Sequence, residues 1–379
     1  MWVASLLMWT APALSIDLHV NSSSSIKDAA AVVAKGLMNY YQPDIGAFAC
    51  EYCWWQLGQA AGALIDYQYF TSSKEYEPVV HNILAKQSQN QYRPTAQIGV
   101  EGNDDQSFFG FALLTALERT FTKTEGLDYE RSVINITQQQ IQQWDTRTCG
   151  GGLRWQYRQE NVGWDSKTMV TNGGLYALCG RLARWTNDSQ YVEMAETVWE
   201  WTVEVALQRQ FAYYDNADVK LNCSEVDHTQ WTYNPAFFLV GSAYLLNATG
   251  NDTYLYRTNS ILDGMEIFYA NGTICEIACE PDECDKDQAS FKGVVARFLA
   301  STRALIPETA EQIRKYLEPS AQGAARSCSG GTDGVTCGVD WTRDSWDEKY
   351  GIGEQLSALE TIQSLLATSD DAPLHGSSK

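Results

Sequence analysis

The chain has 379 residues and is strongly acidic, because 47 Asp and Glu outnumber 27 Lys and Arg to give a net charge of −20. A surface of this sign repels phosphate backbones and anionic lipid headgroups, so the composition excludes nucleic acid as a partner. Hydrophobic residues make up 44% of the chain and aromatic residues 12%, which supplies a large core and excludes disorder over most of its length.

The first 15 residues, MWVASLLMWTAPALS, are uncharged and apolar and end in a small-x-small pattern. This pattern is typical of a secretory signal peptide; the alternative is a buried first helix, because the stretch is too short to span a bilayer. No later apolar run reaches the roughly 18 residues that a membrane-spanning helix needs. The sequence therefore predicts an exported chain without a transmembrane helix.

Ten cysteines are scattered along the chain. Their even number favours disulfides, and the lack of paired CxxC motifs or nearby histidines argues against a zinc site. The pairing does not follow from the sequence, and a redox pair is the alternative for Cys50 with Cys53. Seven Asn-x-Ser/Thr sequons also favour a glycosylated, secreted protein. The sequon asparagines are Asn21, Asn135, Asn187, Asn222, Asn247, Asn251 and Asn271.

A segment of one kind occurs six times, with starting points 48 to 63 residues apart. Each copy has a small residue, then an apolar stripe of helical period and, in most copies, a polar turn. The copies are residues 62–71, 110–120, 173–187, 235–250, 292–305 and 354–367.

A second helical pattern lies between most copies, as in residues 76–87, 191–206 and 254–269. Six helical hairpins at this period predict an all-α closed ring of twelve helices in a single domain. We expect Gly, Ala and aromatic residues on the inner helices and charge on the outer ones. An open solenoid is the alternative, although neither end shows a polar cap. Strands are expected to be few, at residues 152–157 and 274–277.

Two adjacent acids, Asp104 and Asp105, stand just before the second repeated segment. One interpretation is structural, with Asn103 as the N-cap and two first-turn acids that complement the helix dipole. The other is catalytic: the carboxyl groups project about 100° apart and can flank one bond at the roughly 5 Å separation of a retaining glycosidase. The helix N-terminus favours one anion, and repulsion raises the pKa of its neighbour. The dipeptide therefore predicts a nucleophile and a general acid.

Aromatic and amide side chains near the starts of the repeated segments predict a saccharide platform, because rings stack on sugars and amides bind hydroxyls. Core packing is the alternative for each of them. The predicted substrate-binding residues are Asn103, Trp54, Trp55, Trp155, Gln156, Trp231, Tyr233 and Asn234. Lys167 and Asn172 are further candidates to bind hydroxyls or to orient the carboxylates, with solvated loop residues as the alternative. The four histidines are widely spaced, so neither a Ser-His-Asp triad nor a metal site is predicted, and no cofactor is expected.

Four motifs together resemble glycoside hydrolase family 76. They are residues 101–106 (EGNDDQ), 152–156 (GLRWQ) and 231–234 (WTYN), and Trp54-Trp55 followed by residues 62–67 (GALIDY). The fungal cell-wall branch of the family is most similar, through Cys279-Glu280 and the stretches 284–292 and 328–338. The resemblance extends over roughly residues 25 to 368.

This resemblance implies an (α/α)6 toroid and a retaining endo-acting enzyme on α-1,6-linked mannose, with Asp104 as nucleophile and Asp105 as general acid/base. For the fungal branch it implies recognition of the mannose core of glycosylphosphatidylinositol (GPI) anchors and transfer of anchored mannoproteins to cell-wall β-glucan. The chain departs from the family pattern at Pro235 and in a polar tail that resembles the start of a GPI-anchor signal without its hydrophobic part.

We therefore expect a signal peptide at residues 1–15, a catalytic domain at 16–368 and a polar tail at 369–379. The expected partner is a mannose-containing glycan, with β-glucan as acceptor, and membrane contact only through a GPI anchor. The expected location is secreted, in the cell wall or on the outer face of the plasma membrane. The alternative function is a non-catalytic protein that binds mannan or GPI glycan in the same cleft; a scaffold with no sugar site ranks third.

Overall fold

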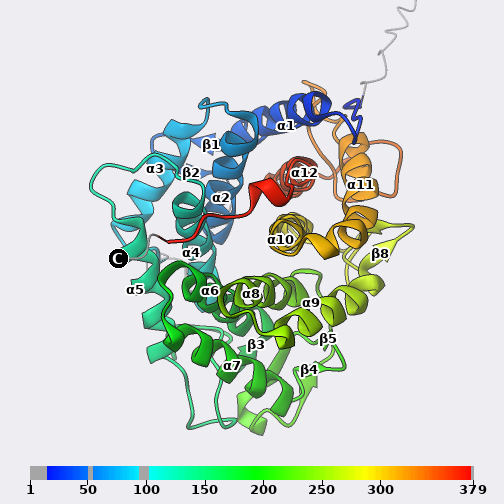
Figure 1. Ribbon diagram of the computed structural model, residues 1–379. Coiled ribbons are helices and arrows are strands. Elements are labelled where there is room, and N and C mark those ends of the chain that lie inside the picture. Colours follow the sequence, from blue (N-terminus) through cyan, green and yellow to red (C-terminus); the bar gives the residue numbers. More distant parts are fainter. Residues whose placement is uncertain (1–14, 50–53, 94–101, 377–379) are drawn as a thin grey trace, which may run out of the picture.

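The computed structural model describes residues 15–49, 54–93 and 102–376, so Cys50, Cys53 and almost all of the predicted signal peptide lie outside the described residues. Figure 1 looks along the axis of a ring of helices. The inner helices carry the six repeated segments: α2 (Trp54–Thr71), α4 (Asn103–Glu118), α6 (Met169–Thr186), α8 (Tyr233–Thr249), α10 (Phe291–Leu305) and α12 (Ile352–Ser364). The outer helices alternate with them: α1 (Ser23–Met38), α3 (Glu77–Ser88), α5 (Tyr129–Gln142), α7 (Ser189–Glu204), α9 (Asp252–Gly264) and α11 (Ala310–Ser327).

The inner ring closes on itself. Each inner helix packs against the next inner helix along the chain, and α12 packs against α2 and against the outer helix α1. The predicted all-α ring, an (α/α)6 toroid, is therefore confirmed in its closed form rather than as an open solenoid. None of the helices in the described ranges is both long and apolar enough to cross a membrane.

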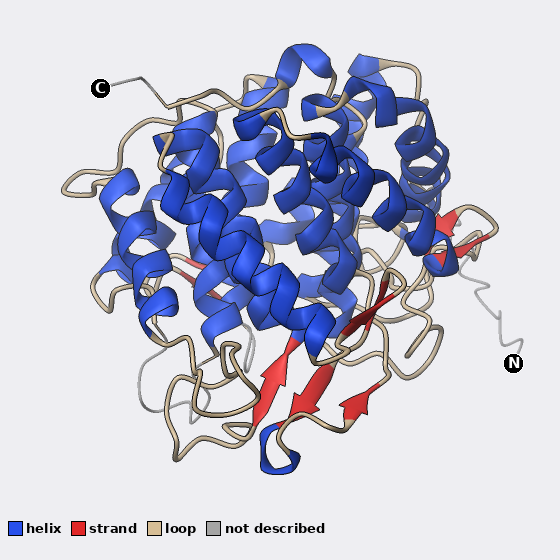
Figure 2. Cartoon of the chain, turned by 60° about the horizontal axis from the view of Figure 1, so that its bottom comes forward, coloured by secondary structure: helices blue, strands red, loops and turns tan. Residues whose placement is uncertain are grey.

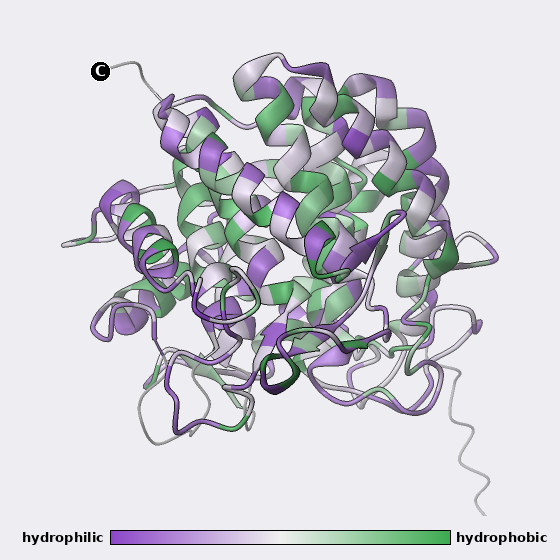
Figure 3. Ribbon diagram, turned by 90° about the horizontal axis from the view of Figure 1, so that it is seen from below, coloured by the Kyte–Doolittle hydropathy of each residue, from purple (hydrophilic) through white to green (hydrophobic). Residues whose placement is uncertain are grey.

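Burial separates the two sets of helices as their sequence patterns predict. In α6 every residue from Met169 to Arg184 is buried, whereas the outer helix α1 buries one face at positions such as Ile26, Ala30 and Val33. Figure 3 shows the apolar residues concentrated on the inner helices. The inner helices also approach closely: a Cβ on Gly180 of α6 would lie 2.6 Å from the carbonyl oxygen of Gly241 in α8. A larger residue would force these two helices apart.

The short strands lie toward one end of the ring (Figure 2). One antiparallel sheet has the order β3–β6–β7, in which Ala217 is paired with Lys167 on one side and Val226 on the other. The other strands form the antiparallel pairs β1–β2, β4–β5 and β8–β9. The bounds are β1 (Tyr41–Gln42), β2 (Ala47–Phe48), β3 (Ser166–Thr168), β4 (Gln208–Arg209), β5 (Ala212–Tyr213), β6 (Asn216–Asp218), β7 (Val226–Asp227), β8 (Tyr269–Ala270) and β9 (Thr273–Ile274).

The strand predicted at residues 152–157 is wrong. This stretch is an extended loop with one isolated bridge, between Gly102 and Gln156. Its alternating pattern has another cause, because Leu153 packs in the core while Arg154 pairs with Asp145 at 3.1 Å. Of the predicted strand at 274–277, only its first residue is in a strand, at the end of β9.

Three disulfides join described cysteines: Cys149–Cys223, Cys279–Cys284 and Cys328–Cys337. The prediction of disulfides is confirmed at these six residues. Within the described ranges, Cys179 and Cys275 are free thiols. The first disulfide ties the loop after α5 to the loop before β7, and both loops lie near the end of the ring at which the strands gather.

The axis of the ring is filled in layers. Phe111, Phe237 and Phe298, from three inner helices, meet with ring centroids 5.4 to 5.8 Å apart. Nearer the C-terminal ends of the inner helices, a buried ionic layer joins Arg297 to Asp66 (2.7 Å) and Arg181 to Glu118 (2.7 Å).

The described part of the polar tail, residues 369–376, packs against this end of the ring. The Arg119 guanidinium donates to the carbonyl of Asp371 (2.5 Å), and Arg184 donates to the carbonyls of Pro373 (2.6 Å) and Leu374 (2.9 Å). Figure 1 shows the segment after α12 running across the ring. The tail thus covers the end of the ring opposite the starts of the inner helices.

Candidate active site

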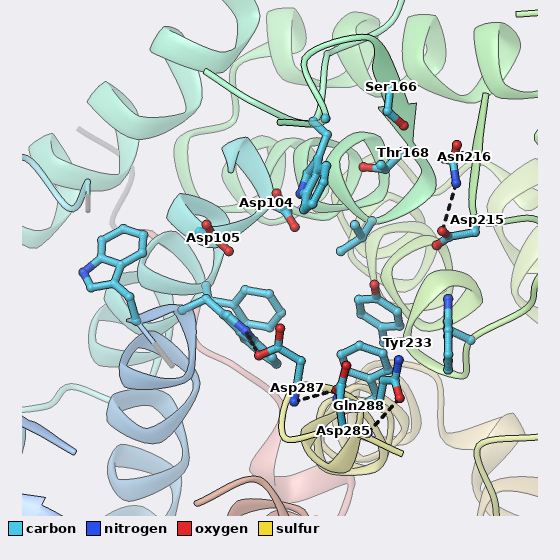
Figure 4. Close-up of a pocket in the computed structure, with 18 residues that line it drawn as sticks. Asp104, Asp105, Ser166, Thr168, Asp215, Asn216, Tyr233, Asp285, Asp287 and Gln288 are labelled. Atoms are coloured by element: carbon cyan, nitrogen blue, oxygen red, sulfur yellow. Dashed lines mark hydrogen bonds between the residues drawn. The ribbon is translucent and has the colours of Figure 1, made fainter. Parts of the chain in front are cut away.

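A cavity of about 560 Å³ opens at the end of the ring where the inner helices begin. Its walls come from the first residues of five inner helices and from the loops between them (Figure 4). The apolar and aromatic lining residues are Trp54, Trp55, Phe108, Trp155, Val170, Trp231, Tyr233 and Phe291. The polar lining residues include Asp104, Asp105, Ser166, Thr168, Asp215, Asn216, Asp285, Asp287 and Gln288.

Asp104 and Asp105 lie in the first turn of α4 and face the cavity (Figure 4). The N-cap of this helix is Gly102 and not Asn103 as predicted, because helical geometry already includes Asn103. The Gly102 N–H donates to Asp105 Oδ2 (3.0 Å), and the Thr171 hydroxyl donates to Asp104 Oδ1 (3.4 Å). A Cβ on Gly102 would collide with Asp104 Oδ1 and lie 2.8 Å from Asp105 Oδ2. Glycine at this position therefore leaves room for both carboxyl groups.

Burial raises the pKa of both carboxyl groups above the usual value for aspartate. The pKa of Asp104 rises to about 7, against the opposing effect of hydrogen bonds from the helix backbone, Trp155 and Thr171. The pKa of Asp105 rises well above its usual value, because of burial first, then the negative charge of Asp104, and to a smaller extent that of Asp287. The surroundings therefore favour ionisation of Asp104 over that of Asp105.

Five of the predicted sugar-binding rings line the cavity: Trp54, Trp55, Trp155, Trp231 and Tyr233. Tyr233 stacks on Phe291 with centroids 4.0 Å apart, and Trp231 meets the same phenylalanine edge to face at 5.6 Å. These five rings come from three separate segments that the fold brings together: the start of α2, the loop that carries Trp155 and the start of α8. The structure therefore assembles an aromatic wall around the carboxyl pair.

The other five predicted substrate contacts are buried and do not line the cavity: Asn103, Gln156, Lys167, Asn172 and Asn234. The Lys167 ammonium donates to the backbone carbonyls of Asp145 (2.9 Å) and Thr148 (2.8 Å), and Asn172 Nδ2 donates to the carbonyl of Leu153 (3.0 Å). Asn103, Lys167 and Asn172 contact the protein because the loop of residues 145–155 folds over them, and they support the wall that carries Trp155. Gln156 accepts a hydrogen bond from Asn161 (3.3 Å), and Asn234 is buried in the first turn of α8.

Sequence reasoning missed three carboxyl groups in the lining, those of Asp215, Asp285 and Asp287. Asp287 accepts a hydrogen bond from Trp55 Nε1 (3.0 Å), and Asp285 accepts from the backbone N–H groups of Asp287 (2.9 Å) and Gln288 (3.0 Å). The stretch from Cys284 to Lys292 was a signal for two of these acids, whereas Asp215 stands in no motif. The described lining thus holds five carboxyl groups and no Lys or Arg.

Within the described ranges, no three His, Cys, Asp or Glu side chains are grouped so as to hold a metal ion. The described lining of the cavity consists of carboxyl groups, hydroxyls, amides and mainly aromatic apolar side chains.

A closed ring of helical hairpins with a carboxyl pair in an aromatic cavity defines the (α/α)6 toroid class of glycosidases. The chain belongs to glycosyl hydrolase family 76, and the model of this family matches residues 25–377. The protein is therefore a glycosidase.

Its curated relatives are fungal. The chain is 44% identical over 363 residues to the mannan endo-1,6-alpha-mannosidase DCW1 of Candida glabrata, covering 92% of this chain and 81% of that protein. It is 41% identical over 375 residues to the mannan endo-1,6-alpha-mannosidase DCW1 of Saccharomyces cerevisiae, covering 95% and 83% respectively.

Solved structures of other proteins share the fold, and two of them are described below. Dfg5 from Chaetomium thermophilum, in complex with glucosamine, is 28% identical with a TM-score of 0.87 and covers 94% of this chain and 96% of that chain. An inactive α-1,6-mannanase variant from a Salegentibacter species, with two aspartates of consecutive number replaced by asparagine and α-1,6-mannotriose bound, is 19% identical with a TM-score of 0.73. This second alignment covers 90% of this chain and 99% of that chain.

Proposed function

We propose that the protein is a retaining enzyme that cleaves α-1,6-mannosidic bonds, with Asp104 as the nucleophile and Asp105 as the general acid/base. The observation that carries this proposal is the adjacent carboxyl pair, which shares one cavity at the start of α4 but differs in its surroundings. Asp104 accepts a hydrogen bond from Thr171, while Asp105 meets the negative charges of Asp104 and Asp287. One group is thus suited to be an anion and the other to hold a proton.

In the first step, Asp105 gives its proton to the glycosidic oxygen as the bond from that oxygen to C1 of mannose breaks. The Asp104 carboxylate forms a bond to C1, which yields a glycosyl ester. In the second step, Asp105 takes a proton from the incoming hydroxyl, whose oxygen attacks C1 and releases Asp104. Water as the incoming group gives hydrolysis, and a sugar hydroxyl gives transfer.

The substrate assignment follows from the relatives and from the lining. The fungal relatives are named for endo-acting cleavage of α-1,6-mannan, and the Salegentibacter neighbour holds α-1,6-mannotriose. The Chaetomium neighbour holds glucosamine, an amino sugar. A lining with five carboxyl groups and no described Lys or Arg favours a glycan that carries an amino group beside its mannose units, as the GPI-anchor core does.

We further propose that the natural reaction is transfer of GPI-anchored mannoproteins from the anchor glycan to cell-wall β-glucan. The protein would then be secreted and act in the cell wall or on the outer face of the plasma membrane. The sequons, the disulfides and the fungal relatives support this location.

The assignment of roles is tested by Asp104→Asn and Asp105→Asn on α-1,6-mannotetraose. Loss of the acid/base is expected to cost about 100- to 10,000-fold in rate. On an aryl mannoside whose leaving group needs no proton, the Asp105 variant should release the aryl group of the first turnover quickly, because only the second step still lacks its base, whereas the Asp104 variant should show no such burst. Turnover of mannotetraose by both folded variants at the natural rate would contradict the proposal. Binding of mannotetraose by the natural protein without any cleavage would instead support the non-catalytic alternative.

Transfer is tested separately, by product analysis with and without a β-1,3-glucan acceptor. A covalent product that contains both donor mannose and acceptor glucan is expected. Free mannose oligosaccharides alone in both reactions would reject transfer and leave the cleavage assignment standing.

A further inference from the structure

A second hollow lies on the outside of the ring, between the outer helices α7 and α9 and the β4–β5 hairpin. It measures about 520 Å³ and is lined mainly by apolar surface from Trp199, Val203, Phe211 and Tyr256. Figure 1 shows these three elements together at the outer edge of the molecule, away from the centre of the ring. We call this hollow the α7–α9 groove.

The groove exposes large apolar side chains to solvent. Tyr256 is 65% exposed and Val203 is 50% exposed. Phe211 lies between the two helices, with its ring centroid 6.1 Å from Tyr256 and 6.5 Å from Trp199. The exposed ring of Tyr256 thus lies beside the half-buried rings of Phe211 and Trp199. Aromatic rings of this kind offer faces on which the apolar faces of sugar rings can stack.

One polar group in the groove lacks a partner. Gln208 lines the groove and is only 5% exposed, and its side-chain Oε1 has no hydrogen-bond partner among the described residues. A buried acceptor left unpaired costs free energy, so a ligand that donates a hydrogen bond there would be favoured. Sugar hydroxyls and the N–H of an N-acetyl group are donors of this kind.

A glycan attachment signal begins at the end of the same groove. Asn251 opens the sequon Asn251-Asp252-Thr253, is exposed, and is the N-cap of α9. Thr253, the third residue of the sequon, lines the groove, and Tyr256 follows it one turn later on the same face of the helix. The rise from Asn251 to Tyr256 is only about 8 Å along the helix axis. A glycan on Asn251 would therefore be tethered at the edge of the groove, at a high effective concentration.

We propose that Asn251 carries an N-linked glycan whose first sugars occupy the α7–α9 groove, stacking on Tyr256 and Phe211 and donating a hydrogen bond to Gln208. Attachment joins Asn251 Nδ2 to C1 of N-acetylglucosamine, while the bond from C1 to the lipid diphosphate of the oligosaccharide donor breaks and the amide gives up one proton. The glycan would cover the exposed ring of Tyr256 and donate a hydrogen bond to the buried acceptor of Gln208.

The test uses the full chain secreted from a glycosylating host. Asn251→Asp removes the sequon but keeps a side-chain acceptor at the N-cap, where the Asn251 side chain accepts from the Thr253 N–H (3.0 Å). Mass spectrometry of the peptide that contains Asn251 shows whether a glycan is attached. Hydroxyl-radical labelling of Tyr256 shows whether that glycan shields the ring from solvent. We expect a glycan on Asn251 of the natural protein, and severalfold more labelling of Tyr256 in the Asn251→Asp variant.

Three controls sharpen the test. Thr253→Ser retains the sequon and should leave Tyr256 protected. Asn135→Gln removes an exposed sequon on α5, away from the groove, and should not change labelling of Tyr256. Digestion of the natural protein with an endoglycosidase that leaves one N-acetylglucosamine should expose Tyr256 in part, which avoids any folding defect of a variant.

An unoccupied Asn251, or equal labelling of Tyr256 with and without the glycan, would overturn the proposal. So would protection of Tyr256 in the Asn251→Asp protein by added α-1,6-mannotriose alone, because the groove would then be a site for a free saccharide. These experiments do not depend on mannan cleavage, which is expected to be the same in all these proteins. The glycan proposal can therefore fail while the proposed catalytic roles stand, and the reverse also holds.

Discussion

Asp105 meets two negative charges in the cavity, one from its neighbour in α4 and one from Asp287 across the space that a glycan would fill. Asp287 is itself oriented by Trp55, whose indole N–H donates to it at 3.0 Å. The pKa of Asp105 therefore depends in part on a side chain far away in the sequence, in the loop before α10.

Asp287→Asn is expected to move the alkaline limb of the pH–rate profile to lower pH. Removing a negative charge stabilises the Asp105 anion, so the pKa of Asp105 falls and the protonated acid is lost earlier, by roughly half a unit to one unit. The measurement is kcat/KM for α-1,6-mannotetraose across pH. Asp282→Asn, in the same loop but highly exposed, is the matched control and should not move either limb.

Gly102→Ala is expected to lower kcat by about 100-fold while the fold is kept, because a displaced carboxyl group loses its alignment with the reacting carbon. The backbone at Gly102 has a φ of −75°, which alanine adopts without strain. The added methyl group therefore acts only on the two carboxyl groups. Kinetics together with the melting temperature check this, and a natural kcat would show that the carboxyl positions tolerate the shift.

Among individual side chains, the sequence predicts those that lie next to each other in the chain better than those that the fold brings together. Asp104 and Asp105 stand in one motif, and their place at a helix start follows from the pattern after them. Lys167 has the same polar character in the sequence whether it faces a sugar or three backbone carbonyls. Only the folded path of residues 145–155 shows that it is enclosed.

The site is formed by the first turns of the inner helices. The inner helices begin at one end of the ring, so their first turns face the cavity while the connecting loops close its sides. The loop of residues 145–155 carries Trp155 into the wall, and it is fixed by the Cys149–Cys223 disulfide and by Lys167.

Lys167→Met is expected to destabilise the protein by about 3 kcal/mol, because the buried carbonyls of Asp145, Thr148 and Gly151 lose their shared donor. The free energy of unfolding in urea is the measurement. Lys220→Met, which removes an exposed lysine near the same sheet, should change it little. If Lys167 instead bound substrate, KM would rise while the free energy of unfolding stayed constant.

Helical elements were predictable because their apolar stripe repeats over many turns. The six repeated segments all fall in inner helices, and residues 76–87, 191–206 and 254–269 fall on α3, α7 and the region from α9 to β8. Residues 152–157 were wrongly predicted to form a strand because apolar and polar residues alternate there for another reason, which is their tertiary contacts. Leu153 is buried by the core and Arg154 is held by Asp145, with no neighbouring strand involved.

Buried glutamates in several inner parts of the fold determine how the stability of the protein depends on pH. Burial raises the pKa of Glu276 to about 8 and those of Glu354 and Glu360 to about 7. Between the ordinary pKa of glutamate and these values the folded protein binds more protons than the unfolded chain. Stability therefore falls as pH rises through this range.

We expect the melting temperature to be highest near pH 4 to 5 and to decline toward pH 8. Glu360→Gln removes one of the titrating groups, so its decline between pH 5 and 7 should be shallower than that of the natural protein. Glu311→Gln, at an exposed position on α11, should leave the slope unchanged. Equal slopes in all three proteins would contradict the role of burial at Glu360.

The closed ring was predictable from six segments at a near-constant spacing, because twelve helices of that kind can bury their apolar stripes by closing. The position of the tail, which covers the far end of the ring, was not predictable from the sequence. Residues 369–376 are small and polar in the sequence, and only the arginines at the ends of α4 and α6 explain their place.

Because the tail, the ionic layer and the phenylalanine layer fill the axis, a glycan cannot be threaded through the ring. Whatever enters the cavity leaves by the same mouth. In the mechanism that we propose, a released fragment must therefore depart before an incoming hydroxyl can reach a glycosyl ester on Asp104, which imposes ping-pong order on the proposed transfer. In double-reciprocal plots, rates at several acceptor concentrations are then expected to fall on parallel lines, and an intersecting pattern would show that both glycans fit in the cavity together.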